Sequence, residues 1–344
     1  MRVAVVGAGI MGASTALALT DRGHDVTIYE KYPLPHAQGS SHGASRIVRR
    51  AYPDAFYTEI MLDAYPRWEV LDERLGGRVL FETGLLYVGA ESSPDVHSMH
   101  QGLVDLAVEH VVLPHDRIDE IYPAFIAQPG EVGIFTPGAG WVAAERAVVG
   151  SIQLAQEYGA TLIVEFVPDP VRLIENFDAV CICAGGWAKE LFNLPLAVTL
   201  QTFAYLDLPP QGHGPVWIED GPHGIYGFPP EPGTNRVKYG VHSPGNEIDP
   251  RSAERPFSDE KLELLKDFAT RRWGISDPIP EPQSCLYSST SNIDFLFGEA
   301  VSGVFWASPC SGHGFKFGPW VGALMADFVE QRQHPREWPR FYHA

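Results

Sequence analysis

Short apolar runs alternate with amphipathic stretches at the start of the chain, and this alternation predicts strands and helices in turn. Residues 3–6 form a β-branched run, VAVV, that is typical of a strand buried on both faces of a parallel sheet. A helix is expected over residues 10–22, where Gly23 stops it, and a second strand over residues 25–29. Strand, helix and strand in this order indicate an α/β fold.

The same patterns predict the elements farther along the chain. Helices are expected over residues 57–74, 92–109, 143–159, 259–273 and 319–331, and β-like segments at 80–89, 161–166, 179–183 and 303–307. From 199 to 242, segments such as PVWIED, GIYGF and NRVKYGVH are divided by Pro and Gly, which predicts an antiparallel sheet. We expect that sheet to face the substrate, and the 344 residues to form two closely joined domains.

Composition narrows the classes of partner. The formal net charge of −18 disfavours nucleic acid and anionic membranes. No apolar run reaches the roughly 18 residues of a membrane span, and the N-terminal apolar run is the first expected strand rather than a signal peptide. We therefore expect a cytoplasmic enzyme that acts on a small molecule. The four cysteines suit neither a disulfide framework nor a metal site, so no metal is expected.

The first turn of the chain, GAGIMG, has the spacing of a dinucleotide-binding loop. Gly7 permits a tight turn, Gly9 lets the backbone approach a pyrophosphate, and Gly12 lets the following helix pack closely on the strand. The N-terminus of that helix would face the phosphates. Glu30 ends the second strand, where its carboxylate can accept hydrogen bonds from the adenosine ribose. The motif predicts a dinucleotide site but does not separate FAD from NAD.

Two later segments indicate contacts with the same ligand. In SSHGASRIVRRAY, Arg46 and Arg49 are three residues apart, which would place them on one side of a helical turn after a glycine-rich loop that can pass over a cofactor. The apolar run at 179–183 ends in AGGW, which indicates a second approach of backbone to a nucleotide. Cys181 and Cys183 belong to that run and are expected to be small buried residues, whereas Cys285 lies in the more polar QSCLY.

Six motifs carry a resemblance to a known family: GAGIMG, GSSHGASRIVRRAY, CAGGWA, VKYGVH, SCLYSST and SGHGFKFG. Over nearly its whole length the sequence resembles the flavin-dependent amine oxidases typified by monomeric sarcosine oxidase and N-methyltryptophan oxidase. The resemblance implies FAD bound through a thioether from Cys285 to the 8α carbon of the flavin. It also implies a two-domain fold, with a Rossmann-like FAD-binding domain (1–85, 138–195 and 286–344) and an antiparallel-sheet substrate domain (86–137 and 196–285).

The resemblance assigns roles to individual residues. Lys238 would face the flavin and promote its reaction with oxygen, and His242, on the same strand face, would tune substrate binding. Arg49 and Lys316 match the pair that holds the substrate carboxylate, and Tyr226 is aligned with an active-site tyrosine. The expected cofactor contacts are Gly7, Gly9, Ile10, Met11, Gly12, Glu30, Lys31, Ser41, His42, Arg46, Gly185, Trp187, Cys285, Gly312, Gly314 and Lys316.

The sequence departs from the family pattern in three places. The stretch between Phe166 and Asp178 is short, which should alter a peripheral hairpin. One aromatic, Tyr226, stands where two consecutive aromatics are common. Ser308-Pro309-Cys310 replaces a small-Gly-aromatic run, so the pocket wall should differ.

Together these features predict a monomeric FAD-dependent oxidase of a carboxylate-bearing amine, such as sarcosine or another N-methyl or cyclic amino acid. The products would be an imine and hydrogen peroxide, with molecular oxygen as the acceptor. An NAD-dependent hydroxy-acid dehydrogenase is the first alternative, but it leaves Cys285 and SGHGFKF unexplained. A non-catalytic flavin-binding redox protein is the second, and the loss of Lys238, Arg49 or Lys316 would have favoured it.

Overall fold

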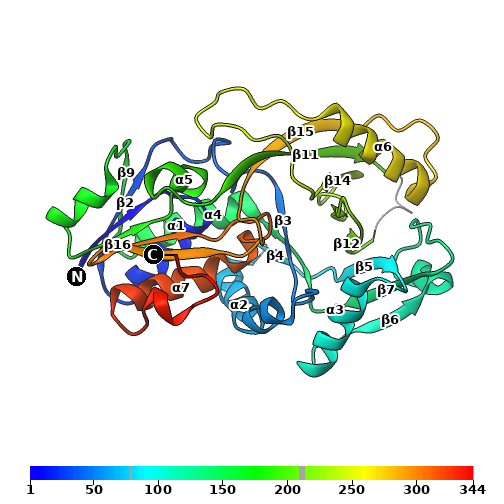
Figure 1. The fold of residues 1–344 in the computed structure, drawn as a ribbon, viewed down its shortest axis with the longest axis horizontal. Coiled ribbons are helices and arrows are strands. Elements are labelled where there is room, and N and C mark those ends of the chain that lie inside the picture. Colours follow the sequence, from blue (N-terminus) through cyan, green and yellow to red (C-terminus); the bar gives the residue numbers. More distant parts are fainter. Residues whose placement is uncertain (78, 209–213, 344) are drawn as a thin grey trace.

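The computed structural model describes residues 1–77, 79–208 and 214–343, which form two sheet regions side by side along the long axis (Figure 1). The first region holds a mainly parallel sheet in the order β16-β17-β10-β1-β2-β9, and both termini lie in this half (Figure 1). Its strands are β1 (Arg2–Val6), β2 (Asp25–Glu30), β9 (Thr161–Val164), β10 (Ala179–Ile182), β16 (Leu296–Val301) and β17 (Val304–Ser308). This confirms the expected α/β class.

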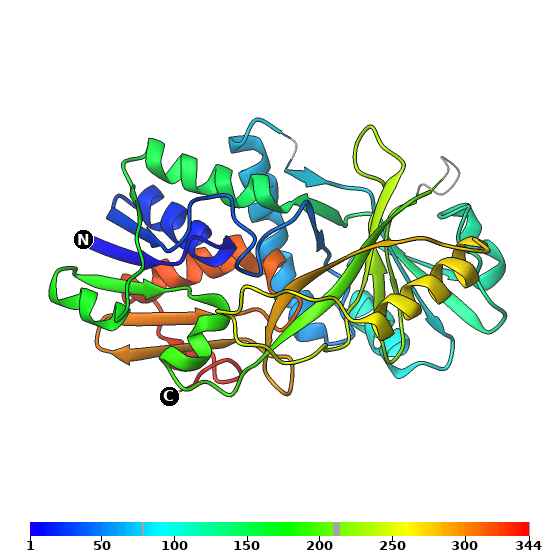
Figure 2. The same cartoon turned by 90° about the horizontal axis from the view of Figure 1, so that it is seen from above.

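Helices cover the parallel sheet because their apolar faces continue its core. α1 (Ile10–Asp21) packs between α4 (Ala144–Glu157) and α7 (Gly318–Val329), and α2 (Ala55–Arg74) packs against α7 (Figure 2). The core that they share with the sheet includes the fully buried Trp68 and Phe317. The short α5 (Ala188–Leu191) and the 3₁₀ helix η3 (Gly185–Trp187) follow β10 at its carboxyl end.

The second region is a larger sheet in the order β15-β11-β14-β13-β12-β5-β7-β6. Its neighbours pair antiparallel, as expected, except for β12 and β5, which are parallel. α6 (Asp259–Trp273) packs on β11 and β14, and α3 (Pro94–Asp105) packs on β5. The strands are β5 (Leu85–Ala90), β6 (Val111–Pro114), β7 (Glu131–Thr136), β11 (Ala197–Asp207), β12 (Val216–Glu219), β13 (Ile225–Gly227), β14 (Arg236–Val241) and β15 (Glu281–Ser289).

A small sheet, β3-β8-β4, lies between these regions and corrects one prediction. The helical turn expected at Arg46 and Arg49 is wrong, because Arg46 belongs to the strand β3 (Ser45–Val48) and Arg49 follows that strand. β3 pairs antiparallel with β8 (Gly140–Ala143), which also pairs with β4 (Leu80–Phe81). Pairing with a strand almost a hundred residues away overrides the local helical spacing.

The predicted helices are present, and capping residues account for the ends of α6 and for the start of α3. α6 runs over the expected residues because Ser258 accepts a hydrogen bond from the N–H of Lys261 and Gly274 adopts a left-handed conformation, with φ of 66°. α3 begins two residues later than expected, because Ser93 caps it and Pro94 occupies its first turn. Within the described residues, no helix combines the length and the apolar character that crossing a membrane would need. The domain boundaries given above stay a prediction.

Candidate functional site

A cavity of about 790 Å³ extends from the turn after β1 to the face of the second sheet. Every residue assigned above to the site lines it except Gly12. A Cβ at Gly12 would collide with the carbonyl oxygen of Gly7, so this glycine lets α1 pack against the turn rather than contacting the cavity. Gly7 has a φ of 96° and lies against the carbonyl of Cys183, which explains why a side chain is excluded there.

The amino end of α1 meets the loop that follows β2. Ser41 Oγ accepts a hydrogen bond of 3.0 Å from the N–H of Ile10, and a Cβ at Gly9 would lie 3.1 Å from the same Oγ. Backbone at this helix end therefore faces the cavity with little intervening side chain, an arrangement that suits an anionic phosphate group.

Glu30 is held as a carboxylate at this end of the cavity. Its oxygens accept hydrogen bonds from the N–H groups of Ala8 at 2.8 Å and Tyr32 at 3.1 Å, and His36 Nε2 lies 3.4 Å away. Burial raises the pKa of Glu30, but the contacts with His36, Ala8 and Tyr32 outweigh burial and leave this pKa below its ordinary value. The ionised group can accept hydrogen bonds from ribose hydroxyls.

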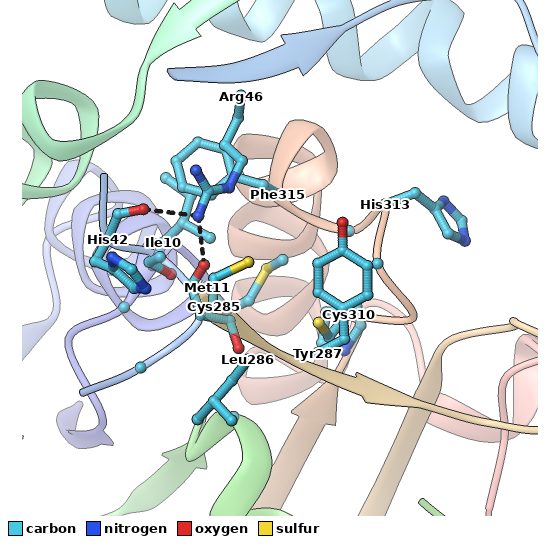
Figure 3. A pocket seen from close by; sticks show the side chains of 18 of the residues that line it. Ile10, Met11, His42, Arg46, Cys285, Leu286, Tyr287, Cys310, His313 and Phe315 are labelled. Atoms are coloured by element: carbon cyan, nitrogen blue, oxygen red, sulfur yellow. Dashed lines mark hydrogen bonds between the residues drawn. The ribbon is translucent and has the colours of Figure 1, made fainter. Parts of the chain in front are cut away.

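Arg46 lines the cavity, and its guanidinium is hydrogen-bonded to backbone oxygens (Figure 3). Its N–H groups donate to the carbonyls of Ser45, Ser40 and His42 at 2.8, 2.9 and 2.7 Å, and the group lies 5.6 Å from the ring centre of Phe315. Burial, followed by the charge of Arg46 and of Lys238, lowers the pKa of His42 to about 4. The imidazole of His42 is therefore neutral near pH 7.

Lys238 and Cys285 both line the cavity, from β14 and β15, the two strands that flank β11 in the second sheet. Lys238 is 4% exposed, donates a hydrogen bond of 3.1 Å to the carbonyl of Ser45, and lies 4.8 Å from the ring centre of Phe203. Burial and the charge of Arg46 lower its pKa to about 7.

Cys285 lies on β15 and is buried, which corrects the expectation of a polar setting. Burial raises the pKa of its thiol, while the charges of Arg46 and Lys238 act in the opposite direction. The sequence pattern around Cys285 did not predict a strand. Unlike the buried Cys181, however, Cys285 does line the cavity.

Tyr226, Tyr287 and His242 form one contiguous wall. The Tyr226 and Tyr287 side chains are hydrogen-bonded, and the rings of His242 and Tyr287 have centres 5.7 Å apart. A Cβ at Gly312 would lie 2.6 Å from Tyr287 and 2.7 Å from His242, so this glycine makes room for them. Burial, together with the charges of Arg49 and Lys316, lowers the pKa of His242 to about 4. His242 is thus neutral near pH 7.

Arg49 and Lys316 converge on Tyr52 from opposite ends of the chain. Their charged groups lie 4.2 and 5.4 Å from the ring centre of Tyr52. The Lys316 ammonium donates to the carbonyl of His313 at 2.8 Å, whereas Arg49 Nη1 is buried with no hydrogen-bond partner. Burial and the charge of Arg49 lower the pKa of Lys316 well below its ordinary value.

His313 links the site of Arg49 and Lys316 to neighbouring segments of the chain through hydrogen bonds of its ring. Burial holds its pKa well below the ordinary value, so the imidazole is neutral. Its Nε2 lies 3.0 Å from the carbonyl of Ile293, which can only accept, so Nε2 carries the proton. Nδ1, 3.4 Å from the Tyr52 hydroxyl, must then accept from it.

Four of the basic residues that line the cavity lack an acidic partner among the described residues. Among the described residues, Arg46, Arg49, Lys238 and Lys316 have no carboxylate within ion-pair distance, and Arg49 Nη1 and Trp187 Nε1 lack any hydrogen-bond partner. Buried cations are costly without an anion, so the site fits negatively charged ligand groups. In the part of the chain that the structure describes, no cluster of His, Cys, Asp and Glu is suited to a metal ion.

Sequence reasoning missed several residues that line this cavity: Tyr52, Tyr57, Tyr87, Tyr287, His313 and Arg340. Tyr52 and His313 lie within RIVRRAY and SGHGFKFG, so the motifs contained them without indicating their contact. Gly314 lines the cavity as expected, and its small size also serves a tight turn, since a Cβ there would collide with the carbonyl of Pro309.

Comparison with known proteins identifies the family. The family model described as "FAD dependent oxidoreductase" (DAO) matches residues 2–328. Peroxisomal sarcosine oxidase from Homo sapiens is 29% identical, covering 93% of this chain and 90% of that protein. N-methyl-L-tryptophan oxidase from Yersinia pestis is 26% identical, covering 96% and 95%. The solved structure of NikD, an amino acid oxidase of nikkomycin biosynthesis, shares the fold, with a TM-score of 0.82 at 22% identity over 99% of this chain and 96% of that one.

Proposed function

The chain belongs to the DAO family of FAD-dependent oxidoreductases, and from this membership and the unpaired basic groups of the cavity we propose that it oxidises a small amine bearing a carboxylate. The amine, sarcosine or another N-methyl or cyclic amino acid, would become an imine, and molecular oxygen would become hydrogen peroxide. The relatives named as sarcosine and N-methyl-L-tryptophan oxidases support this class of substrate.

FAD would occupy the cavity from the α1 turn to the second sheet. Glu30 suits the ribose, the N-terminus of α1 suits the pyrophosphate, and Arg46 and Lys238 suit the electron-rich edge of the flavin ring. Cys285 is the residue that we propose to bind the flavin covalently, because it is the cavity thiol whose pKa both Arg46 and Lys238 act to lower. When bound, FAD supplies the two-electron acceptor of the reaction.

The single observation that carries the substrate proposal is the unpaired Arg49 Nη1 beside Lys316. The two cations flank one aromatic ring, and Arg49 retains an unused donor inside the protein. A substrate carboxylate would accept hydrogen bonds from both Arg49 and Lys316. A guanidinium can bind a carboxylate through two parallel hydrogen bonds. This clamp would fix the position of the amine nitrogen relative to the rest of the cavity.

His242 would act on the other end of the substrate. Because its pKa is about 4, the ring is neutral and one of its nitrogens can accept a hydrogen bond from an amine N–H. Tyr226 and Tyr287 close the same wall and exclude water from it.

Neither alternative function accounts for these features as well. An NAD-dependent dehydrogenase gives no role to Cys285 or to the neighbouring Arg46 and Lys238, and the family model is one of FAD-dependent enzymes. A non-catalytic flavoprotein would not require the two buried basic residues, Arg49 and Lys316, beside Tyr52. A monomeric state and a cytoplasmic location remain predictions from the sequence.

Matched acid and ester pairs of N-methyl and cyclic amino acids test the clamp. We expect peroxide formation with the acids and a kcat/KM lower by about two to three and a half decades with the esters, because an unpaired buried charge costs about 3–5 kcal/mol. Arg49→Lys should impair the acids while leaving the esters almost unchanged, since lysine cannot reproduce bidentate binding. Equal kcat/KM within each pair would show that the carboxylate clamp is not used.

A further inference from the structure

Arg340 lines the cavity although it lies only four residues from the end of the chain. The segment that carries it is firmly anchored. Phe341 is fully buried, and the N–H of Phe297 donates to its carbonyl at 2.8 Å. Tyr342 forms a parallel bridge with Phe297 of β16. The guanidinium of Arg340 is therefore held at one place on the cavity wall.

From this place Arg340 joins two segments that are distant in sequence. Its guanidinium lies 2.6 Å from Asp54 Oδ2, at the start of α2, and 2.8 Å from Asp294 Oδ1, in the loop between β15 and β16. Asp294 Oδ1 also accepts a hydrogen bond of 2.7 Å from the Tyr57 hydroxyl. The side chain of Asp294 is 8% exposed and that of Arg340 is 34% exposed, so the ion pair is shielded from solvent on the carboxylate side.

The Asp294 loop in turn contacts the residues around Lys316. Ile293, next to Asp294, presents the carbonyl that accepts from His313 Nε2, and the carbonyl of His313 accepts from the Lys316 ammonium. The His313 ring packs between Phe295, with ring centres 4.9 Å apart, and Tyr57, at 4.8 Å. A shift of the loop would therefore move both the imidazole and the ammonium.

We propose that Arg340 is a positioning residue of the substrate site: by pairing with Asp294 and Asp54 it fixes the loop that sets His313 and, through His313, the Lys316 ammonium. The proposal rests on the proposed function for the role of Lys316 as half of the carboxylate clamp. It assigns to the C-terminal segment a part in substrate binding. In this role Arg340 acts through its two carboxylate partners, Asp54 and Asp294, rather than on the substrate.

Arg340→Gln tests this role, with Arg336→Gln as the matched control. Arg336 lies on the same segment and is exposed like Arg340, but its guanidinium donates to the Tyr342 hydroxyl and pairs with no carboxylate among the described residues. The first readout is amide hydrogen exchange, by mass spectrometry, in the segments around residues 290–296 and 311–317. Arg340→Gln should increase exchange in both segments, and Arg336→Gln in neither. Unchanged exchange in Arg340→Gln would overturn the proposal.

The second readout is the ratio of kcat/KM for an acid and its ester. Misplacement of a positioned group by about 1 Å can cost on the order of 10²-fold, so the ratio should fall by about 10- to 100-fold in Arg340→Gln. Arg340→Lys, which keeps one ion pair, should recover part of it. Increased exchange with an unchanged ratio would mean that Arg340 is only structural, and would also overturn the proposal. A wild-type protein that does not distinguish acid from ester would instead refute the proposed function, while hydrogen exchange would still decide whether Arg340 holds the loops.

Discussion

Lys238 shows how burial converts an ordinary side chain into a group that titrates near neutral pH. Its ammonium is buried in the cavity wall near Arg46, and burial and the charge of Arg46 together lower its pKa to about 7. A cation at this point would stabilise the negative charge that oxygen acquires as it is reduced. The charged fraction of Lys238 falls as pH rises through its pKa, so its assistance should fall in the same direction.

We therefore predict that the reaction of the reduced enzyme with oxygen slows as pH rises through about 7. Lys238→Met should lower this rate by ~10²- to 10³-fold, the usual cost of losing one preorganised charge, and should flatten its pH dependence. Stopped-flow reoxidation measures both effects, and flavin reduction by substrate should change less. Lys261→Met is a suitable control, because Lys261 lies on α6 and donates to Ser243 instead of lining the cavity. Normal reoxidation in Lys238→Met would remove this lysine from the mechanism.

At the scale of elements, the sequence pattern predicted those helices and strands whose bounds are set by residues close in sequence. The bounds of α6 could be predicted because Ser258 and Gly274, which cap it, are visible in the sequence. The strand β15 could not, because its polar sequence has no clear alternation and its stability comes from pairing with β11 along nearly its whole length. β3 was mistaken for a helical turn for the same reason, since its partner β8 is remote in sequence.

Arg272 joins α6 to the second sheet through two buried ion pairs. Its guanidinium is 3% exposed and binds Glu131 of β7 at 2.6 Å and Glu219 of β12, whose Oε1 accepts from Nε at 2.7 Å. Removal of the shared cation would leave two largely buried carboxylates uncompensated. The neighbouring Arg271 is 42% exposed and also contacts Glu219, which makes it a natural comparison.

We predict that Arg272→Met lowers the free energy of unfolding by about 3–5 kcal/mol, whereas Arg271→Met changes it by about 1 kcal/mol or less, because exposed ion pairs contribute little. Urea denaturation followed by circular dichroism measures both values. Similar losses in the two variants would contradict the view that the buried arginine holds α6 on the sheet.

At the scale of the whole molecule, the motifs predicted most of the site but not how its parts meet. Arg49, Lys238, Cys285 and Lys316 were identified individually, and the structure brings them into one cavity. The contact between Tyr52 and His313 spans 261 residues of sequence and depends on how α2 packs against the C-terminal elements. Such contacts depend on how the two sheet regions pack together, and a local sequence pattern does not predict that packing.

Because residues of both sheet regions line the cavity, a bound FAD would join them. A ligand that binds only the folded protein stabilises it by an amount that grows with its concentration, about 2.7 kcal/mol at 100 times Kd. A covalent flavin cannot dissociate, so the stability of the protein would not depend on the concentration of free FAD. Replacement of Cys285 should make this dependence measurable, provided that this thiol is the point of attachment.

We therefore predict that the yellow colour of the wild-type protein stays with the polypeptide after acid denaturation, and that Cys285→Ala releases FAD under the same conditions. In Cys285→Ala the melting temperature should rise with added FAD, because binding and folding are then linked by mass action. Cys310→Ala is the matched control, since Cys310 also lines the cavity but lies after β17 rather than on β15, and it should retain covalent flavin. Free FAD in the supernatant of the wild-type protein, or covalent flavin retained by Cys285→Ala, would show that Cys285 is not the attachment site.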